Sequence, residues 1–308
     1  MGLEQIYKGP AQPTSPEQML GWLDAPPPWR DNRDQASIDR APRRDETAAR
    51  RGRTYVPTSE DEIDRVNLAL WLRRPILVTG PPGIGKSSLA YGIAEALGLA
   101  APLRWEINSH STLHEGLYAY DAVAHFQAAR VRSEGAVPAS EFIRLGPLGT
   151  AFVPTKQPRV LLVDELDKAS WDLPNDLLHV FEEGAFTIPE LARQAEPARV
   201  QLDDSTSPDD RVQLSGARVR VRHHPVVVIT SNAEREFSDA FRRRCVALPM
   251  GTLSPERLAD VVRSHLGDAQ LSKLEQLGEV ETDVVLQTLY AISHGADLSA
   301  VRDVLRRT

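Results

Sequence analysis

One short segment of the chain carries the groups that bind a phosphate, Gly80-Pro81-Pro82-Gly83-Ile84-Gly85-Lys86-Ser87, with Ser88 directly after it. Glycines let the backbone wrap an anion, so that successive N–H groups and the start of a following helix point at phosphate oxygens. Lys86 adds a point charge for the β- and γ-phosphates, and Ser87 offers a hydroxyl to Mg²⁺, which prefers oxygen ligands. The spacing predicts a nucleotide-binding phosphate loop over Gly80–Ser88; a glycine-rich turn without a ligand is the alternative.

Two adjacent carboxylates follow an apolar run at Val163-Asp164-Glu165. Asp164 can hold the hydration shell of the metal, and Glu165 can orient and deprotonate a water that attacks the phosphate. A kinase would not need this second carboxylate. A solvated strand end would look the same in isolation, but the position after a phosphate loop favours a hydrolytic site.

Two further groups of polar residues lie later in the chain. Thr230-Ser231-Asn232 ends another apolar run, where the Asn232 amide could hydrogen-bond the attacking water or the γ-phosphate. Three arginines, Arg242 to Arg244, precede the next apolar segment. Charge runs are commonly solvated, but an arginine presented to the γ-phosphate of a neighbouring subunit would stabilise transition-state charge, an effect of about 10³–10⁵ in rate.

Strands that alternate with helices must position these residues. Apolar runs predict strands at 76–79, 103–107, 159–163, 225–230 and 246–248. Apolar periodicity predicts helices from a capping box at Ser59-Glu60-Asp61-Glu62 to about Arg74, after Lys86, and over 254–266, 281–293 and 298–307. This order predicts an α/β fold, a parallel sheet between two helical layers, with ligands at the carboxyl ends of the strands.

Composition divides the chain into three regions. Residues 1–57 hold eight of the 23 prolines and an arginine-rich run, which predicts an extension without its own core. Residues 58–250 carry the alternating pattern of the core, and residues 251–308 turn helical. Trp22 and Trp29 are exceptions within the extension. They either dock onto another surface or tether a loose tail.

Whole-chain composition narrows the class of protein. A net charge of -7 over 308 residues means that the chain as a whole is not basic. A nucleic-acid partner is therefore possible but not favoured. No apolar run reaches the roughly 18 residues that span a bilayer, and the first residues lack the layout of a signal peptide. The single cysteine excludes an intrachain disulfide. We expect a cytoplasmic protein without a membrane partner.

The phosphate loop, Val163-Asp-Glu165, Thr230-Ser-Asn232 and Arg243-Arg-Cys245 occur in the order and over spacings similar to those of AAA+ ATPases. Within that superfamily the chain resembles the MoxR-type ATPases, and the likeness runs from about Thr54 to the C-terminal end. Such proteins carry an insertion in the second helix, here about 111–150, and a hairpin before the fourth strand, here about 186–222. The resemblance implies Mg²⁺-dependent ATP hydrolysis, a sheet of order 5-1-4-3-2, a helical lid over 251–308 and a homo-oligomeric, hexameric ring.

The resemblance also implies roles for residues around the loop. Asn232 matches the first sensor. Arg244, directly before Cys245, is the first choice for the arginine finger that reaches the next subunit, and Arg243 is the second. Asn108, at the end of the second strand, could restrain Glu165.

Two more implied positions complete the nucleotide site. Tyr55 and Val56, before the first helix of the core, would lie near the adenine. Arg302 resembles the second-sensor arginine that contacts the γ-phosphate within one chain, and Arg306 or Arg307 could serve instead.

Three functions are compatible with these motifs. The first is a ring ATPase that remodels or activates a partner protein, since MoxR-type proteins act with von Willebrand A-domain or other effector proteins. The second is an ATP-switched scaffold of a prokaryotic defence or signalling system, in which the extension tethers a partner. The third is a motor on DNA, which is disfavoured by the acidic residues of the predicted hairpin, Asp203, Asp204, Asp209 and Asp210.

Overall fold

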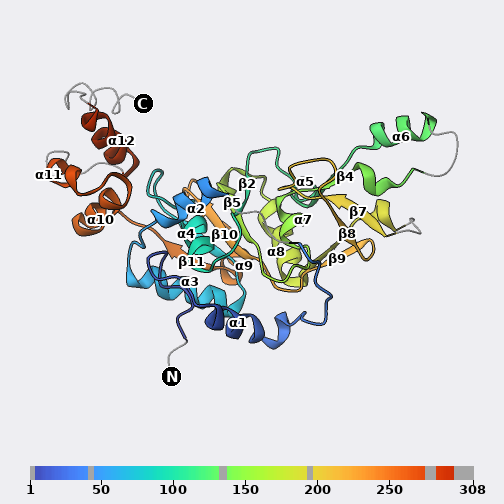
Figure 1. Ribbon diagram of the computed structural model, residues 1–308, viewed down its shortest axis with the longest axis horizontal. Coiled ribbons are helices and arrows are strands. Elements are labelled where there is room, and N and C mark those ends of the chain that lie inside the picture. The colour runs from blue at the N-terminus through green and yellow to red at the C-terminus, as the bar shows by residue number, and fades with distance from the viewer. Residues whose placement is uncertain (1–3, 41–44, 132–136, 193–196, 275–281, 295–308) are drawn as a thin grey trace.

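A parallel sheet of five strands forms the centre of the computed structural model, which describes residues 4–40, 45–131, 137–192, 197–274 and 282–294 (Figure 1). The strands lie in the order β11 (Val246–Pro249), β1 (Ile76–Thr79), β10 (Val226–Ser231), β5 (Val160–Asp164) and β2 (Leu103–Glu106), and all neighbours are parallel. In chain order this is 5-1-4-3-2. All five predicted strands and the predicted sheet order are confirmed.

Helices cover both faces of this sheet because successive strand residues point to opposite sides. On one face Ile76 and Val78 pack in a buried cluster with α3 (Glu60–Leu72) and α4 (Ser88–Ala96). On the other face Leu77 and Val163 pack with α7 (Pro147–Ala151), α8 (Leu173–Glu183) and α9 (Asp239–Arg244). The predicted three-layer α/β fold is therefore confirmed.

The N-terminal segment adds side chains to the α3/α4 cluster. It contains α1 (Pro16–Asp24), η1 (Pro28–Arg30) and α2 (Glu46–Arg53), and α1 lies beside α3 in Figure 1. Trp22 is 1% exposed, and its indole N–H donates a 3.0 Å hydrogen bond to the carbonyl of Leu70. Trp29, in contrast, is 74% exposed. Of the two tryptophans, Trp22 docks onto the chain's own core.

Two long connections build a second layer of strands beside the main sheet. The segment between β2 and β5 contains α5 (Leu113–Leu117), β3 (Tyr118–Tyr120), α6 (Ala122–Val131), η2 (Ala139–Phe142) and β4 (Ile143–Leu145). The segment between α8 and β10 contains β6 (Ala185–Thr187), η4 (Pro189–Leu191), β7 (Ala198–Gln201), β8 (Arg211–Leu214) and β9 (Arg218–Arg220). Strands β3, β4, β7 and β8 form one sheet and β6 pairs with β9, while α6 projects away from the body (Figure 1).

Arginines of the same chain neutralise part of the acidic loop between β7 and β8. Arg40 lies 3.5 Å from Asp204 and 2.8 Å from Asp210, and the buried Arg159 lies 3.0 Å from Asp204. The loop is therefore attached to the N-terminal segment and to the start of β5.

The C-terminal helices form a small cluster of their own. These are α10 (Pro255–Leu266), η5 (Asp268–Gln270), α11 (Leu271–Leu274) and α12 (Thr282–Ser293), with Val262, Val285 and Leu289 buried between them. The predicted helix at 298–307 lies outside the described residues. In the part of the chain that the structure describes, no helix is both long and apolar enough to cross a membrane.

Candidate nucleotide-binding site

The glycine-rich loop between β1 and α4 has the backbone that its glycines allow. Gly80, Gly83 and Gly85 have φ angles of 156°, 73° and 98°, in the region that side-chain-bearing residues rarely adopt. A Cβ on Gly80 would also lie 2.3 Å from the carbonyl oxygen of Met250. The loop therefore depends on glycine both for its turn and for its contact with the end of β11.

Lys86 is held inside this loop. Its Nζ donates hydrogen bonds of 2.8 and 2.7 Å to the carbonyls of Gly80 and Pro81 and one of 2.7 Å to Oδ1 of Asn232. Burial lowers the pKa of Lys86, and the carboxylates of Asp167, Glu165 and Asp164 oppose that shift. A phosphate that enters the loop would replace the carbonyl contacts with charge-assisted ones.

Asp164, the last residue of β5, is surrounded by donors. Its Oδ1 accepts 2.7 Å hydrogen bonds from the hydroxyls of Ser87 and Thr230, and its Oδ2 accepts from Arg104 Nη2 at 2.9 Å. Burial alone would raise the pKa of Asp164, but these three partners outweigh it and lower that pKa. The carboxyl therefore stays ionised.

The pairing of Ser87 with Asp164 fits a Mg²⁺ ion. Both line the same cavity, 2.7 Å apart, and supply hard oxygen donors to it. The described residues contain no cluster of three or more His, Cys, Asp or Glu that could hold a metal by themselves. Mg²⁺ commonly takes one or two protein ligands together with substrate phosphates and water, so this sparse donor set suits it.

Glu165 sits just beyond β5 in a left-handed conformation, with φ 61° and ψ 49°. Its N–H donates a 2.9 Å hydrogen bond to the Thr230 hydroxyl, and Lys168 Nζ donates a 2.6 Å bond to its carboxylate. For a residue other than glycine this backbone costs on the order of 1 kcal/mol or more, and such conformations cluster at functional sites. Glu165 lines the cavity from this turn.

The turn that carries Asn232 is anchored by a buried carboxylate. Asp167 Oδ2 accepts hydrogen bonds from the backbone N–H groups of Asn232 and Glu234, at 3.0 and 3.2 Å. The Asn232 side chain is thereby presented to Lys86. Sequence reasoning did not select Asp167; its place two residues after Glu165 was the available signal.

One cavity of about 560 Å³ lies at the carboxyl ends of the strands. It brings together the predicted residues Pro82, Gly83, Gly85, Lys86, Ser87, Ser88, Asn108, Asp164, Glu165 and Asn232. Strand, phosphate loop and helix, with two carboxylates and an amide opposite, form an arrangement that can bind a polyphosphate.

Residues 75–245 match the family described as AAA domain (dynein-related subfamily). This match covers more than half of the chain. The chain belongs to the AAA domain family. No curated protein matches the sequence.

Two solved structures resemble this AAA protein at a distance. The P216G mutant of RuvB from Thermotoga maritima has 15% identity and a TM-score of 0.44, over 82% of this chain and 74% of that one. A candidate ATPase from Cytophaga hutchinsonii has 12% identity and a TM-score of 0.43, over 90% of this chain and 65% of that one. Neither likeness bears on the activity of the AAA protein.

A second, smaller cavity of about 170 Å³ adjoins the phosphate cavity of the AAA domain. Tyr55, Val56 and Ile84 line it, together with Leu253, Val261 and Leu286 from the C-terminal part of the chain. Its mainly apolar wall suits a base. The two residues predicted to lie near an adenine are therefore at this cavity.

Glu62 holds Tyr55 in place. The Tyr55 hydroxyl donates a 2.7 Å hydrogen bond to one oxygen of the buried Glu62, and Thr58 donates through N–H and hydroxyl to the other. Burial raises the pKa of Glu62, although these hydrogen bonds oppose the shift.

The capping box predicted at the start of α3 is half wrong. Ser59 accepts from the Glu62 N–H as predicted, but the Glu62 side chain turns to Tyr55 and Thr58.

The arginines of α9 are not among the residues that line either cavity of the AAA domain. Arg244 forms an ion pair with Glu182 at the end of α8. Arg243 is exposed at the end of α9. Arg302, Arg306 and Arg307 lie outside the described residues.

Two arginines that sequence reasoning did not select also line the phosphate cavity. Arg104 of β2 bridges Asp164 and Glu106, with the latter at 2.8 Å. The period-2 alternation of β2 was a signal for its direction, since Leu103 and Trp105 are buried and Arg104 and Glu106 are exposed. Arg51 comes from α2 in the N-terminal segment, and no local pattern indicated it.

Asn108, which we expected could restrain Glu165, lines the same cavity as Glu165. The carboxylate of Glu165 pairs with Lys168 instead.

Proposed function

We propose that this AAA protein binds ATP with Mg²⁺ and hydrolyses it to ADP and phosphate. One observation carries the proposal: a phosphate loop, an ionised Asp164, a carboxylate at Glu165 and the amide of Asn232 line a single cavity. Hydrolysis needs each of these groups, whereas nucleotide storage would need only the loop.

Each group has a distinct role in the proposed reaction. The loop N–H groups and Lys86 bind the β- and γ-phosphates, and Ser87 and Asp164 hold Mg²⁺. When bound, Mg²⁺ neutralises charge that develops on the phosphates. Glu165 takes a proton from the attacking water, and Asn232 orients that water or the γ-phosphate.

We infer that a second copy of the chain completes this site. Arg244, or Arg243 as the second choice, would reach the γ-phosphate bound by the neighbouring subunit, because neither lines the cavity of its own chain. Such head-to-tail contacts close into rings, and a hexameric ring is our proposal. Arg244 would then leave its ion pair with the exposed side chain of Glu182, at a cost that is small for exposed pairs.

We further propose that the ring is of MoxR type and remodels or activates a partner protein, such as a von Willebrand A-domain or other effector protein. The segment 111–150 serves as the helix insertion and 186–222 as the hairpin, with residues 251–308 as the lid. Helix α6 supports a partner contact, since it exposes Val123, Phe126 and Val131 while projecting from the body (Figure 1).

Glu165→Gln separates binding from hydrolysis. We expect the variant to bind ATP as the wild type does while turnover falls at least about 10²-fold, because the base is lost. Glu236→Gln, an exposed residue outside the cavity, is the matched control. Undiminished turnover in Glu165→Gln would remove Glu165 as the base, and absence of ATP binding by the wild type would refute the proposed function.

A further inference from the structure

Helix α2 of the N-terminal segment lies directly against α4, the helix that begins at the phosphate loop. A Cβ on Gly52 would lie 2.6 Å from the carbonyl oxygen of Tyr91, and a Cβ on Gly92 would lie 2.5 Å from the ring of Tyr55. Gly52 therefore lets α2 touch α4, and Gly92 of α4 makes room for Tyr55, which follows α2. Position 52 therefore cannot accept a side chain without moving α2.

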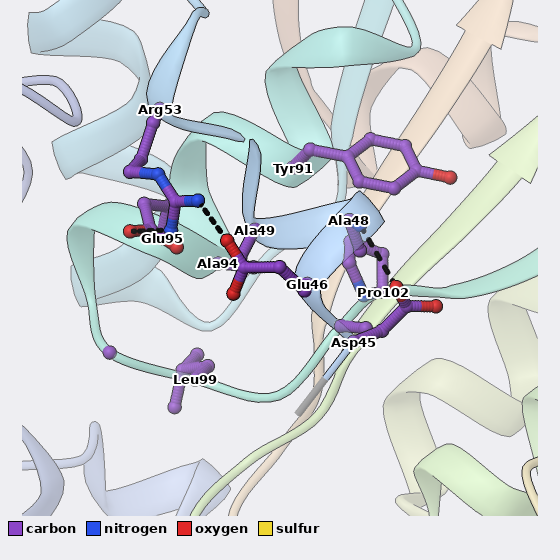
Figure 2. Close-up of a pocket in the computed structure, with 12 residues that line it drawn as sticks. Asp45, Glu46, Ala48, Ala49, Arg53, Tyr91, Ala94, Glu95, Leu99 and Pro102 are labelled. Carbon is purple, nitrogen blue, oxygen red and sulfur yellow. Dashed lines mark hydrogen bonds and ion pairs between the residues drawn. The ribbon is translucent and has the colours of Figure 1, made fainter. Parts of the chain in front are cut away.

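Polar contacts fix the orientation of α2. Asp45 caps its first turn by accepting from the N–H groups of Thr47 and Ala48, at 2.8 and 3.2 Å. Arg53 pairs with Glu46 and lies 3.6 Å from Glu95 of α4. Figure 2 shows Asp45, Glu46, Arg53 and Glu95, together with Tyr91, around a cavity between the two helices.

This packing holds the Arg51 guanidinium over the first turn of α4. Its Nε and Nη2 each donate a 3.3 Å hydrogen bond to the Ser88 hydroxyl, and its Cζ lies 4.2 Å from the centre of the Tyr91 ring. A planar cation stacked on an aromatic face is restrained before any ligand arrives. Arg51 is thus positioned by contacts on two sides.

The charge of Arg51 has no carboxylate partner within the described residues. Three cations line the phosphate cavity there, namely Arg51, Lys86 and Arg104. Arg104 pairs with Asp164 and Glu106, and Lys86 is bonded within the loop and to Asn232. Among the described residues the Arg51 guanidinium contacts only the Ser88 hydroxyl and the Tyr91 ring, so an anionic ligand is the partner that its charge lacks.

The position of Arg51 selects one part of that ligand. The phosphate cavity and the smaller apolar cavity share four lining residues, Arg51, Gly83, Gly85 and Ser88. A nucleotide with its base in the apolar cavity and its terminal phosphates beside Lys86 must pass its α-phosphate across this boundary. A guanidinium fork matches phosphate oxygens there.

We propose that Arg51 binds the α-phosphate of the nucleotide, so that the N-terminal segment is one wall of the nucleotide site. This inference rests on the proposed ATP site. This role of Arg51 differs from that of Lys86, which binds the β- and γ-phosphates, the two phosphates that hydrolysis separates. Because ATP and ADP share the α-phosphate, Arg51 holds both nucleotides equally.

Binding of fluorescent ATP and ADP analogues to the full chain with Mg²⁺ tests this. Arg51→Met keeps the apolar stem over Tyr91 and removes the charge. We expect the Kd for both nucleotides to rise by the same factor, about 10- to 100-fold for a lost charge-assisted contact, with kcat at saturating ATP within about threefold. Arg50→Met, an exposed neighbour on the same helix, is expected to leave both Kd values unchanged.

A second variant tests the same contact without touching the charge. Gly52→Leu is expected to push α2 from α4 and to weaken ATP and ADP binding as Arg51→Met does, with no further loss in the double variant. Thermal unfolding of the nucleotide-free variants shows whether they remain folded. If Gly52→Leu unfolds, the Arg51→Met measurement still decides the proposal.

Three outcomes are distinct. Unchanged Kd values in Arg51→Met, or a loss for ATP alone, would overturn the α-phosphate assignment while leaving the proposed function intact. A wild type that binds neither nucleotide, or a Lys86→Ala variant that binds ATP undiminished, would instead overturn the proposed function. Equal losses for ATP and ADP in Arg51→Met, with a wild-type-like Arg50→Met, would support the assignment.

Discussion

Lys86 Nζ donates a 2.7 Å hydrogen bond to Oδ1 of Asn232, which joins the phosphate loop after β1 to the turn after β10. The strands β1 and β10 are adjacent and parallel, so their carboxyl ends meet at one edge of the sheet. The strand order therefore brings the two loops together, and the bond joins them. This bond also gives the amide of Asn232 a defined direction before any nucleotide binds.

We expect Asn232→Ala to lower kcat about 10²-fold, because removal of one oriented polar group from a charge-stabilising site typically costs this much. The Kd for ATP should change by less than about tenfold, since the loop and Lys86 remain. Steady-state turnover and equilibrium binding measure the two effects. Asn175→Ala, on α8, is the control, and a similar loss of kcat there would argue for a general structural effect.

The free energy of unfolding tests whether the N-terminal segment packs against the core. Trp22→Ala should lower the free energy of unfolding by about 3–5 kcal/mol, because the loss of a fully buried indole leaves a cavity and removes its hydrogen bond to the Leu70 carbonyl. Trp29→Ala, at an exposed position, should change it by less than about 0.5 kcal/mol. Denaturant unfolding followed by circular dichroism measures both, and equal effects of the two substitutions would contradict this docking.

Acid should destabilise the same part of the molecule through His224. Its Nε2 lies 3.3 Å from Asn32 Nδ2, and burial, with help from Arg30, Arg73, Arg220 and His223, lowers its pKa from 6.5 to about 3. The folded chain keeps His224 neutral between these values while the unfolded chain takes up a proton. Stability is therefore full above pH 6.5 and falls by up to about 1.4 kcal/mol per pH unit below it.

The matched variants for this effect are His224→Gln and His110→Gln. Unfolding free energies at pH 7.5 and pH 5.0 should differ less in His224→Gln than in the wild type. His110 is exposed, and its substitution should leave the pH dependence as it is. If His224→Gln retains the wild-type pH dependence, the burial of a neutral His224 does not control acid stability.

The sequence alone was sufficient for the sheet and for the residues at its carboxyl edge. Lys86, Asp164 and Asn232 each follow an apolar run, and parallel strands bring such positions together. Arg51 and Glu182 could not be predicted in the same way. Arg51 reaches Ser88 because Gly52 lets α2 contact α4, and the pair of Glu182 with Arg244 joins two helices through a tertiary contact.

The N-terminal segment shows why local patterns miss such contacts. Its buried hydrophobic side chains include Ile6 and Tyr7, which precede α1, and Met19, Trp22 and Leu23, which share one face of α1. Ile6 and Tyr7 belong to no periodic run, and the side chain of Asn67 on α3 accepts hydrogen bonds from their backbone N–H groups. Only the folded partner surface explains their burial.

The proposed ATP site shared between two copies is tested most directly by mixing two inactive variants. Lys86→Ala cannot bind the nucleotide productively, and Arg244→Ala cannot supply the arginine that reaches the neighbouring subunit. We therefore expect neither variant alone to hydrolyse ATP. In a mixture, Arg244→Ala subunits bind ATP beside Lys86→Ala subunits that retain Arg244. We predict recovery to about a quarter of wild-type turnover at equal amounts, as random assembly of a ring allows. No recovery at any mixing ratio, or full turnover by Arg244→Ala alone, would contradict a site completed in trans by Arg244.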